Sequence, residues 1–257
     1  MSHEPLGKSQ GVGPARHRIC HTLAFLTRGC SAVSKRSNKR LEDDIYQGTA
    51  RLPSTKATKS ALARLLTDFE YAKRAARYAL GLPVPLNTED RRVLEQVIFP
   101  HFLSLPNTQR ILFVGCDWYT KHYERAFFRG RDFRTIDVSP KARKFGARKH
   151  TIDGLGALDA HFAEGYFDII FCNGVYGFGL DAAADCEVAF DRCWSRLRDG
   201  GYFVLGWDDI PARTPVPLDQ IKALSRYQRL PVAELGSWRY MTNTPYRHTY
   251  DFFRRAG

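Results

Sequence analysis

From residue 110 to residue 206, short apolar runs alternate with segments whose apolar residues recur at helical spacing. The runs predict strands at 110–115, 133–137, 149–153, 167–172 and 201–206, and the segments between them predict helices near 120–129, 140–147, 156–163 and 181–198. These strands are apolar along their whole length, which is typical of a parallel sheet covered on both faces. The pattern therefore predicts an α/β domain with a doubly wound, mostly parallel sheet.

The pattern changes after Trp207. A proline-rich link leads into a predicted helix near 217–228, and two strand-like runs follow at 237–242 and 246–254. The second run, "YRHTYDFFRR", alternates partly between apolar and polar positions. We expect these two runs to form a hairpin-like terminal pair, which brings the predicted sheet to seven strands.

Two helices are expected ahead of the first strand, in an N-terminal helical extension at 56–105. In the first helix, which Gly81 and Pro83 end, one apolar face carries Leu62, Leu65, Leu66, Phe69, Ala72, Ala76 and Ala79. The bland interpretation, packing of both helices against the following domain, is favoured over a partner-binding surface or a lid over a pocket.

The second of these helices has a recognisable start and stop. Asn87 or Thr88 is expected to cap it, acidic residues fill its first turn, and Pro100 is expected to kink or end it. Its predicted apolar face consists of Val93, Leu94, Val97 and Ile98.

Charge is concentrated near the start of the chain. The 257 residues have a formal net charge of +12, of which residues 1–40 supply +7. Residues 1–55 are rich in Ser, Lys, Arg, Gly and Pro without sustained periodicity, so they are interpreted as a disordered basic tail. The predicted domain at 106–257 is only mildly basic, and this balance does not favour nucleic acid as a partner.

Six cysteines occur without a CxxC pair or the spacing of zinc ligands. No cluster of acids and amides has the spacing of a divalent-metal site, so no metal is expected. No apolar run approaches the roughly 18 residues of a membrane span. A reduced, cytoplasmic location fits this composition best.

Open α/β sheets bind ligands at the carboxyl ends of their strands, so the residues delivered there are the candidate binding residues. Gly115 ends the first predicted strand, where a missing side chain lets the backbone approach a ligand. Asp137 ends the second and can accept hydrogen bonds from both hydroxyls of a ribose. Asp153 and Gly154 end the third, placed to receive the exocyclic amine of a base. Asn173 and Gly174 end the fourth, and Trp207, Asp208 and Asp209 end the fifth.

Five stretches in this order resemble the motifs of class I S-adenosylmethionine-dependent methyltransferases. They are "ILFVGC", "TIDVSP", "HTIDG", "GYFDIIFCNGV" and "LRDGGYFVLGW", of which the last two are the most specific. The resemblance covers residues 108 to 257 and implies a Rossmann-like, seven-stranded fold. It also implies S-adenosylmethionine as the cofactor, bound by Gly115, Asp117, Asp137, Asp153, Gly154 and Asn173.

The first motif departs from that family. Its usual second and third glycines are replaced by Asp117 and Tyr119, with Trp118 between them. A dinucleotide needs this turn for its pyrophosphate, whereas S-adenosylmethionine has no phosphate and carries an ammonium that Asp117 can bind. The departure from the motif argues more strongly against the hypothesis of an NAD-dependent enzyme than against the hypothesis of a methyltransferase.

The acceptor side is less defined. Asn173 is followed by Gly174-Val175-Tyr176 and not by the Pro-Pro-aromatic sequence of nucleic-acid amino-methyltransferases. We therefore expect a small-molecule acceptor, and O-methylation of a sugar, lipid or secondary metabolite.

No catalytic base is identified from the sequence. Asp208 and Asp209 are favoured for substrate contact, His122 is expected as a solvated helix residue, and His248 as a strand residue with a structural partner. The wider set of candidates is Asn173, Tyr176, Asp208, Asp209, His122 and His248.

Three alternatives remain at this point. The first is a non-catalytic methyltransferase-like binding module that recruits a partner through its tail or helices. The second is an RNA methyltransferase, and the third is an NAD-dependent or nucleotide-sugar enzyme with an unusual turn.

Overall fold

A computed structural model describes residues 69, 72–77, 79, 80, 82, 84 and 86–256. The predicted basic tail at 1–55 lies outside the described residues, as do Leu62, Leu65 and Leu66 of the first predicted helix. Residues 72–77 are helical, as that prediction requires.

The described part of the chain forms one mixed sheet with the strand order β3-β2-β1-β4-β5-β8-β6, and β7 also pairs with β8. Strands β1 to β5 are parallel, and β8 is antiparallel to β5, β6 and β7. The strands are β1 Arg110–Val114, β2 Asp132–Asp137, β3 Lys149–Ile152, β4 Phe167–Asn173, β5 Leu197–Asp208, β6 Tyr227–Arg229, β7 Arg239–Met241 and β8 His248–Arg255. The doubly wound, mostly parallel sheet is confirmed.

One strand was not predicted. The sequence predicts a helix near 217–228, but the chain there forms 3-10 turns at Leu218–Gln220 and Lys222–Arg226 and then β6. The Glu187 carboxylate accepts the backbone N–H groups of Lys222 and Ala223 at 2.6 and 2.7 Å. This side chain satisfies two donors from outside the segment, so a short 3-10 turn is sufficient where a longer helix was expected.

The helices between the parallel strands are shorter than predicted, except the last. α7 spans Ala183–Arg196, and its buried residues Cys186, Ala189, Phe190 and Cys193 recur at spacings of three and four. The other connections are α5 Tyr123–Ala126, α6 Leu158–His161 and 3-10 turns at Trp118–Thr120, Pro140–Phe145 and Leu155–Ala157. Proline or glycine bounds some of these turns closely, as Pro140 and Gly146 do.

The helix before β1 continues through Pro100 and does not end there. It runs as α3 Glu89–Val93, a π-helical turn Leu94–Ile98 and α4 Phe99–Ser104. Proline cannot donate the helical hydrogen bond to the preceding turn, and the wider π-helical turn lies where that bond is missing. Thr88 is its N-cap residue, with extended backbone.

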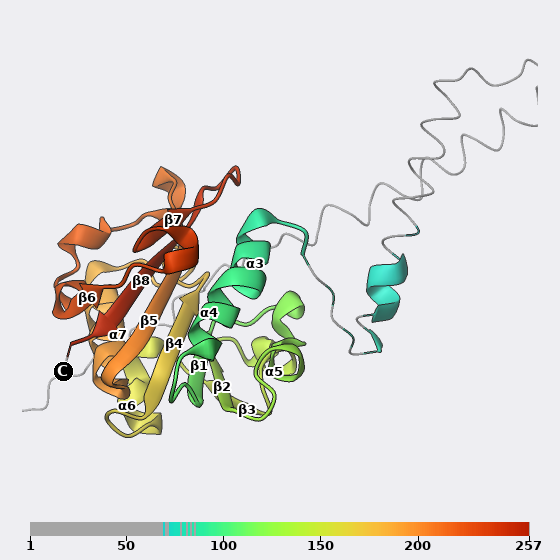
Figure 1. The fold of residues 1–257 in the computed structure, drawn as a ribbon, viewed down its shortest axis with the longest axis horizontal. Helices are drawn as coiled ribbons and strands as arrows, with labels where there is room; N and C mark the ends of the chain where they lie inside the picture. The colour runs from blue at the N-terminus through green and yellow to red at the C-terminus, as the bar shows by residue number, and fades with distance from the viewer. Residues whose placement is uncertain are drawn as a thin grey trace, which may run out of the picture. The chain divides into compact units, whose positions relative to one another are not determined.

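Two apolar clusters cover the two faces of the sheet. On one face, the π-helical turn and α4 contribute Leu94, Ile98, Phe99 and Phe102, which pack with Phe113 and other aromatic residues of the strands. On the other face, α7 packs against Leu112, Ile170 and Phe203. Figure 1 shows α3 and α4 across the near face of the sheet and α7 behind it.

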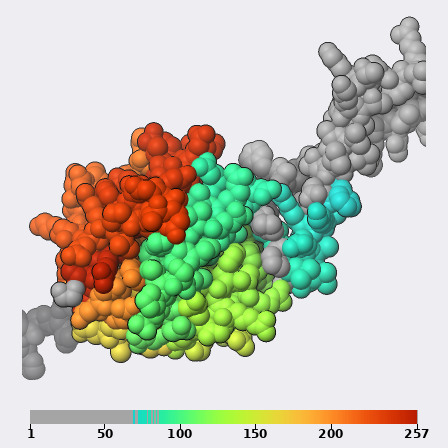
Figure 2. All heavy atoms as spheres, in the orientation of Figure 1, coloured from blue at the N-terminus to red at the C-terminus, as the bar shows by residue number. Residues whose placement is uncertain are grey.

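Thr67–Gly257 forms one compact unit, so α3 and α4 lie in the same unit as the sheet. In Figure 2 they form a green band on the surface beside the orange and red C-terminal residues. The expected packing of the second helix against the domain is therefore found.

Candidate active site

Strand order places the candidate residues at one edge of the sheet. β1 lies between β2 and β4, so the order reverses between β1 and β4, and the carboxyl ends of these two strands form the switch point where such sheets bind ligands. Gly115, Asp137 and Asn173 all lie at this edge, next to or at the ends of β1, β2 and β4.

Gly115 is required by the protein's own packing. Its φ is +82°, and a Cβ at this position would lie 2.5 Å from the backbone oxygen of Asn173. The sequence predicts close approach of a ligand at Gly115, whereas the structure shows close approach of the chain after β4. The glycine thus brings the ends of β1 and β4 together at the switch point.

Asp137 is half-buried at the end of β2, and its carboxylate organises two turns. One oxygen accepts the backbone N–H of Cys116 at 2.9 Å, and the other accepts that of Ser139 at 2.8 Å. A carboxylate has about four acceptor positions, so two remain for a ligand. Burial, and next the charge of Asp137, raise the pKa of the adjacent Cys116 thiol to about 12, so this thiol stays protonated at neutral pH.

Asp117 folds its own turn. Its side chain accepts the Trp118 N–H at 2.6 Å, and the Thr120 hydroxyl accepts the Asp117 N–H at 3.2 Å, which makes a capping box for the 3-10 turn Trp118–Thr120. Asp117 is exposed. Its predicted contact with an ammonium group stays a prediction.

Asp153 forms a similar local arrangement after β3. Its carboxylate accepts the Gly154 N–H at 2.7 Å and contacts Nε2 of His161 at 2.8 Å. These two partners, His161 first, hold the pKa of Asp153 below its usual value. We call Asp117, Asp137 and Asp153 the turn cluster, because each carboxylate accepts backbone N–H groups of the turns beside it.

Four buried polar side chains form a second arrangement, which we call the relay: Arg91, Asn173, His248 and Asp208. Nδ1 of His248 lies 2.6 Å from a carboxylate oxygen of Asp208. With the Asn173 amide oxygen facing Arg91, the amide nitrogen donates to Nε2 of His248 at 3.1 Å and the oxygen accepts from both Arg91 Nη atoms at 3.1 and 3.2 Å. The relay joins α3, β4, β5 and β8, which are far apart in the sequence.

Gly206 makes room for the relay. A Cβ there would lie well under 3.0 Å from the Asn173 amide atom that faces His248, and at 3.0 Å from Nε2 of His248. Because Gly206 pairs with Asn173 across β4 and β5, its missing side chain lets the Asn173 amide reach across the sheet to β8. Neither Gly206 nor Arg91 was among the candidate site residues predicted from the sequence.

A signal for Arg91 does exist in the sequence. Arg91 lies three residues before Leu94 and seven before Ile98, both fully or almost fully buried, so it belongs to the apolar face of its helix. A charged residue in such a face is seldom buried without a partner. Arg91 is 6% exposed, and its partners are the relay and two tyrosines.

Of the two histidine predictions, one agrees with the structure and one does not. His248 has the structural partner expected of it. His122 was expected to be solvated, and that expectation is wrong: it is 6% exposed and packs on the rings of Tyr123 and Phe127. Burial lowers the pKa of His122 to about 4, so its ring is neutral at pH 7.

The remaining acceptor-side candidates also differ in exposure. Tyr176 is fully buried, and its hydroxyl donates to the backbone oxygen of Val216. Asp208 is 7% exposed and belongs to the relay. Asp209 is half-buried and forms an ion pair with Arg247 at 3.3 Å. Asp209 is thus the more accessible of the two adjacent acids.

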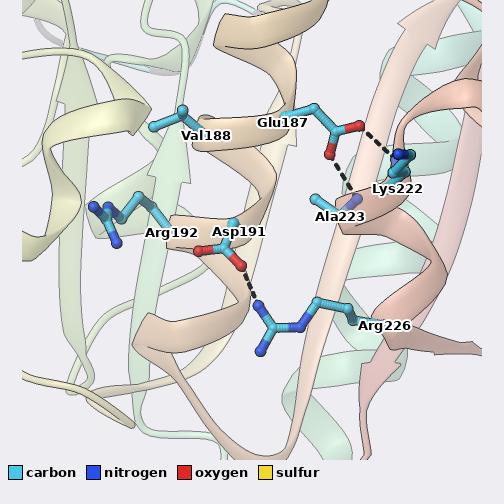
Figure 3. Close-up of a pocket in the computed structure, with 7 residues that line it drawn as sticks. All are labelled: Glu187, Val188, Asp191, Arg192, Lys222, Ala223 and Arg226. Atoms are coloured by element: carbon cyan, nitrogen blue, oxygen red, sulfur yellow. Dashed lines mark hydrogen bonds and ion pairs between the residues drawn. The ribbon is translucent and has the colours of Figure 1, made fainter.

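A surface hollow lies elsewhere on the molecule, between α7 and the 3-10 turn Lys222–Arg226. Figure 3 shows Glu187 and Asp191 of α7 turned toward this turn, with Asp191 paired to Arg226. Its lining residues include none of the strand-end residues described above. The hollow is therefore separate from the candidate active site.

The described residues include no group of three or more His, Cys, Asp or Glu side chains that could hold a metal ion. No helix among them is long and apolar enough to cross a membrane.

The strand-end residues fit S-adenosylmethionine. The open acceptor positions of Asp137 suit ribose hydroxyls. The turn after Gly115 is closed by the side chains of Asp117 and Thr120 and lacks the glycine-rich cradle that a pyrophosphate requires. A cofactor without phosphate groups is the one that this turn can accommodate.

A match to a known protein family agrees with this geometry. Residues 112–205 match the family model described as "Methyltransferase domain". No curated protein sequence matches the chain. The chain is similar to three solved structures, each at low identity and with a TM-score below 0.5.

The first is the N-methyltransferase NodS from Bradyrhizobium japonicum WM9, with 19% identity, coverage of 65% of this chain and 99% of that chain, and a TM-score of 0.46. A TehB-like SAM-dependent methyltransferase from Corynebacterium glutamicum has 18% identity, coverage of 74% and 98%, and a TM-score of 0.46. A SAM-dependent methyltransferase from Archaeoglobus fulgidus has 10% identity, coverage of 64% and 92%, and a TM-score of 0.44.

The family-model match spans β1 to β5, the strands that deliver Gly115, Asp137, Asp153 and Asn173 to one edge of the sheet. Residues 112–205 thus form a methyltransferase domain with the class I fold, and S-adenosylmethionine is the cofactor of such domains.

Proposed function

We propose that this enzyme methylates a hydroxyl group of a small molecule, such as a sugar, a lipid or a secondary metabolite. The observation that carries the proposal is the burial of Tyr176. An aromatic residue shortly after the fourth strand grips the flipped base in nucleic-acid amino-methyltransferases. Here Tyr176 is fully buried, packs on Trp207 and donates its hydroxyl to the Val216 backbone, so its ring is not available to stack on a base.

The loops around the acceptor side support a small site. The loop after β4 contacts the loop after β5 through Arg213, which donates to the Gly177 backbone oxygen at 3.2 Å and lies 4.2 Å over the Phe178 ring. A Cβ on Gly177 would clash with the Arg213 backbone. These loops are fixed to each other by close contacts, which favours a compact acceptor over an extended nucleic acid.

When bound, the cofactor supplies a methyl group on a sulfonium, and an acceptor oxygen takes it in an in-line displacement with loss of the hydroxyl proton. The protein has to align the acceptor and receive that proton. Asp137 is proposed to hold the ribose hydroxyls, Asp153 and Gly154 the adenine amine, Asp117 the ammonium group, and the backbone at Gly115 and Asn173 to line the cofactor.

Asp209 is proposed as the acceptor-side carboxylate. Asp208 is committed to His248 inside the relay, whereas Asp209 is half-buried and its ion pair with Arg247 is long, at 3.3 Å. Asp209 can therefore accept a proton from a substrate hydroxyl without breaking a buried contact.

The test is a screen for release of S-adenosylhomocysteine with the full chain. The acceptor panel contains sugars, lipids, phenols, small amines and RNA. We expect turnover with a hydroxyl-bearing small molecule, and a kcat at least about tenfold lower for Asp209→Asn. Asp219→Asn, the same change at an exposed aspartate away from the strand ends, is the matched control and should retain the activity of the wild type. Turnover with RNA alone would contradict the proposal, as would turnover with amines alone.

A further inference from the structure

Arg91 is a buried cation at the switch point, supplied from outside the stretch that matches the methyltransferase family. It lies in α3, ahead of residues 112–205, and contacts Asn173 at the end of β4 and Tyr119 in the turn after β1. We propose that Arg91 binds the carboxylate at the amino-acid end of S-adenosylmethionine, and that Tyr119 covers Arg91 until the cofactor displaces it. The inference rests on the cofactor assigned above.

The relay fixes the orientation of Arg91. Asp208 accepts from Nδ1–H of His248, so Nε2 of His248 is the acceptor and the Asn173 amide nitrogen donates to it. The amide oxygen then faces Arg91, at 3.1 and 3.2 Å from its two Nη atoms. In this orientation the Asn173 amide oxygen faces donors and its nitrogen faces an acceptor, and the guanidinium is held against the end of β4.

The acceptors around the Nη atoms of Arg91 are neutral. Nη2 lies 3.2 Å from the Tyr119 hydroxyl, and Nη1 lies 3.4 Å from the Tyr123 hydroxyl. The adjacent carboxylate, Asp90, meets Nε instead, at 3.5 Å. A guanidinium binds a carboxylate more strongly than a phenol, often through two parallel hydrogen bonds, so the Nη edge of Arg91 is matched to an anion that its present partners do not supply.

Tyr119 stands where the family usually has a glycine, and it lies directly over the guanidinium. Its ring centroid is 4.3 Å from the Arg91 Cζ atom. The turn that carries it, Trp118–Thr120, is a single 3-10 turn at the surface edge of the sheet, and Tyr119 itself is only partly buried. Displacing this side chain gives a ligand access to Arg91 without disturbing β1, which explains how a first motif without its glycines admits a cofactor.

The amino-acid end of the cofactor also suits the other charges at this edge. It carries an ammonium beside its carboxylate, and Asp117 lies two residues before Tyr119 in the same turn. An acid and a base on the two sides of one turn match a zwitterion. The proposal therefore assigns the carboxylate to Arg91 and leaves the ammonium to Asp117.

The experiment compares two ligands by calorimetry with the full-length protein. S-adenosylhomocysteine carries the amino-acid end, and 5′-methylthioadenosine lacks it. For Arg91→Met we expect the affinity for S-adenosylhomocysteine to fall about 30-fold or more, with the affinity for methylthioadenosine unchanged within about threefold. Arg91→Lys keeps the charge but lacks the two parallel N–H donors of the guanidinium. Its affinity for S-adenosylhomocysteine should lie between those of the wild type and Arg91→Met.

Methylthioadenosine binding also reports that the variant is folded. Equal losses for both ligands in Arg91→Met would make Arg91 a structural residue and overturn the proposal. An unchanged affinity for S-adenosylhomocysteine would overturn it too. A wild type that binds methylthioadenosine but gains nothing from the amino-acid end refutes the role of Arg91 alone, whereas a wild type that binds neither ligand refutes the cofactor assignment as well.

Tyr119→Ala tests the cover separately. Removal of the ring should leave the affinity for S-adenosylhomocysteine equal or raise it several-fold, because the ligand no longer has to displace a side chain. A tenfold or larger loss for S-adenosylhomocysteine, with methylthioadenosine binding retained, would show that Tyr119 is itself a cofactor ligand and would overturn its role as a cover.

Discussion

The turn cluster and the relay lie at the same edge of one sheet, yet they are built in opposite ways. In the turn cluster, Asp117 and Asp153 each accept a backbone N–H from the next residue. Asp137 accepts one from Ser139, two residues on, and one from Cys116, 21 residues before it. In the relay, the contact between Asn173 and His248 spans 75 residues, and that between His248 and Asp208 spans 40. Local contacts at partly exposed carboxylates leave room for a ligand, whereas long-range contacts between buried groups fix one geometry.

This difference predicts how each half tolerates change. A side chain of the turn cluster can be altered with a small effect on folding, because solvent and the local backbone compensate. In the relay, removal of one member leaves a buried partner without its hydrogen bond, which costs far more. Four pairs of variants test that contrast.

The largest difference is expected between two glycines. Gly206→Ala places a Cβ against the Asn173 amide, well under 3.0 Å, whereas Gly154→Ala has only Val138 Cγ1 near, at 3.6 Å. Overpacking of this kind should lower the free energy of unfolding by about 2–3 kcal/mol for Gly206→Ala. For Gly154→Ala we expect a change below about 0.5 kcal/mol. Urea unfolding of both proteins measures the difference, and equal losses would mean that the relay is not tightly packed.

The same contrast explains what the sequence could and could not predict. β1 and β4 were predictable because each is a nearly continuous apolar run. The places of Asp137 and Asp153 were predictable because one ends a predicted strand and the other directly follows β3. The relay was not, since nothing in the local pattern says that Asn173 turns toward His248. That contact depends on β8 pairing with β5 and on the space at Gly206, which only the assembled sheet determines.

The failed helix predictions have a related cause. At 217–228 the apolar spacing suits a helix, but Glu187 in α7 accepts the N–H groups of Lys222 and Ala223 and stabilises a shorter turn. His122 was misplaced because the rings of Tyr123 and Phe127 pack on it, and the assembled core decides that these two aromatic residues are turned inward. Tertiary contacts overrode local preference in both cases.

A second pair compares two histidine–carboxylate contacts of similar length. His248 and Asp208 meet at 2.6 Å with both side chains at most 10% exposed, while His161 and Asp153 meet at 2.8 Å with exposures of 33% and 41%. His248→Leu leaves the Asp208 carboxylate buried without its donor and should cost about 2 kcal/mol of stability. His161→Leu should cost less than about 0.5 kcal/mol. Thermal and urea unfolding measure the stability of the two variants. An equal loss of stability in both would contradict the expected difference between the buried and the exposed contact.

The third test uses pH. The folded protein holds His122 neutral, with a pKa of about 4 because of burial, whereas the unfolded chain takes up a proton near 6.5. Between pH 6.5 and pH 4, His122 therefore takes up a proton when the protein unfolds. The contribution of His122 to the free energy of unfolding is fully present above pH 6.5 and is lost as the pH falls toward 4. We expect a contribution of about 1–2 kcal/mol to that decline.

His122→Phe should remove this part of the decline, while His161→Leu, at a partly exposed histidine, should keep it. Urea unfolding at pH 7, 5.5 and 4.5 gives the slopes. A slope for His122→Phe equal to that of the wild type would show that His122 is protonated in the folded state at these pH values.

The smallest difference within a pair is expected between Asp137→Asn and Asp117→Asn, both inside the turn cluster. Asp137→Asn should have the larger effect of the two. The amide keeps one oxygen for one of the two backbone N–H groups, and its nitrogen faces the other, so the loss should be near 1 kcal/mol. Asp117→Asn, the matched change in the neighbouring turn, keeps the oxygen that accepts the Trp118 N–H and should cost about 0.5 kcal/mol or less.

The two variants should differ more clearly in ligand affinity than in stability. If Asp137 accepts both ribose hydroxyls, Asp137→Asn loses about tenfold in affinity for both S-adenosylhomocysteine and methylthioadenosine, since both ligands carry the ribose. Arg91→Met is expected to affect only the first. A loss for Asp137→Asn confined to S-adenosylhomocysteine would place Asp137 at the amino-acid end of the cofactor. The turn cluster would then bind the part of the cofactor that is assigned above to Arg91 of the relay, and both assignments would be wrong.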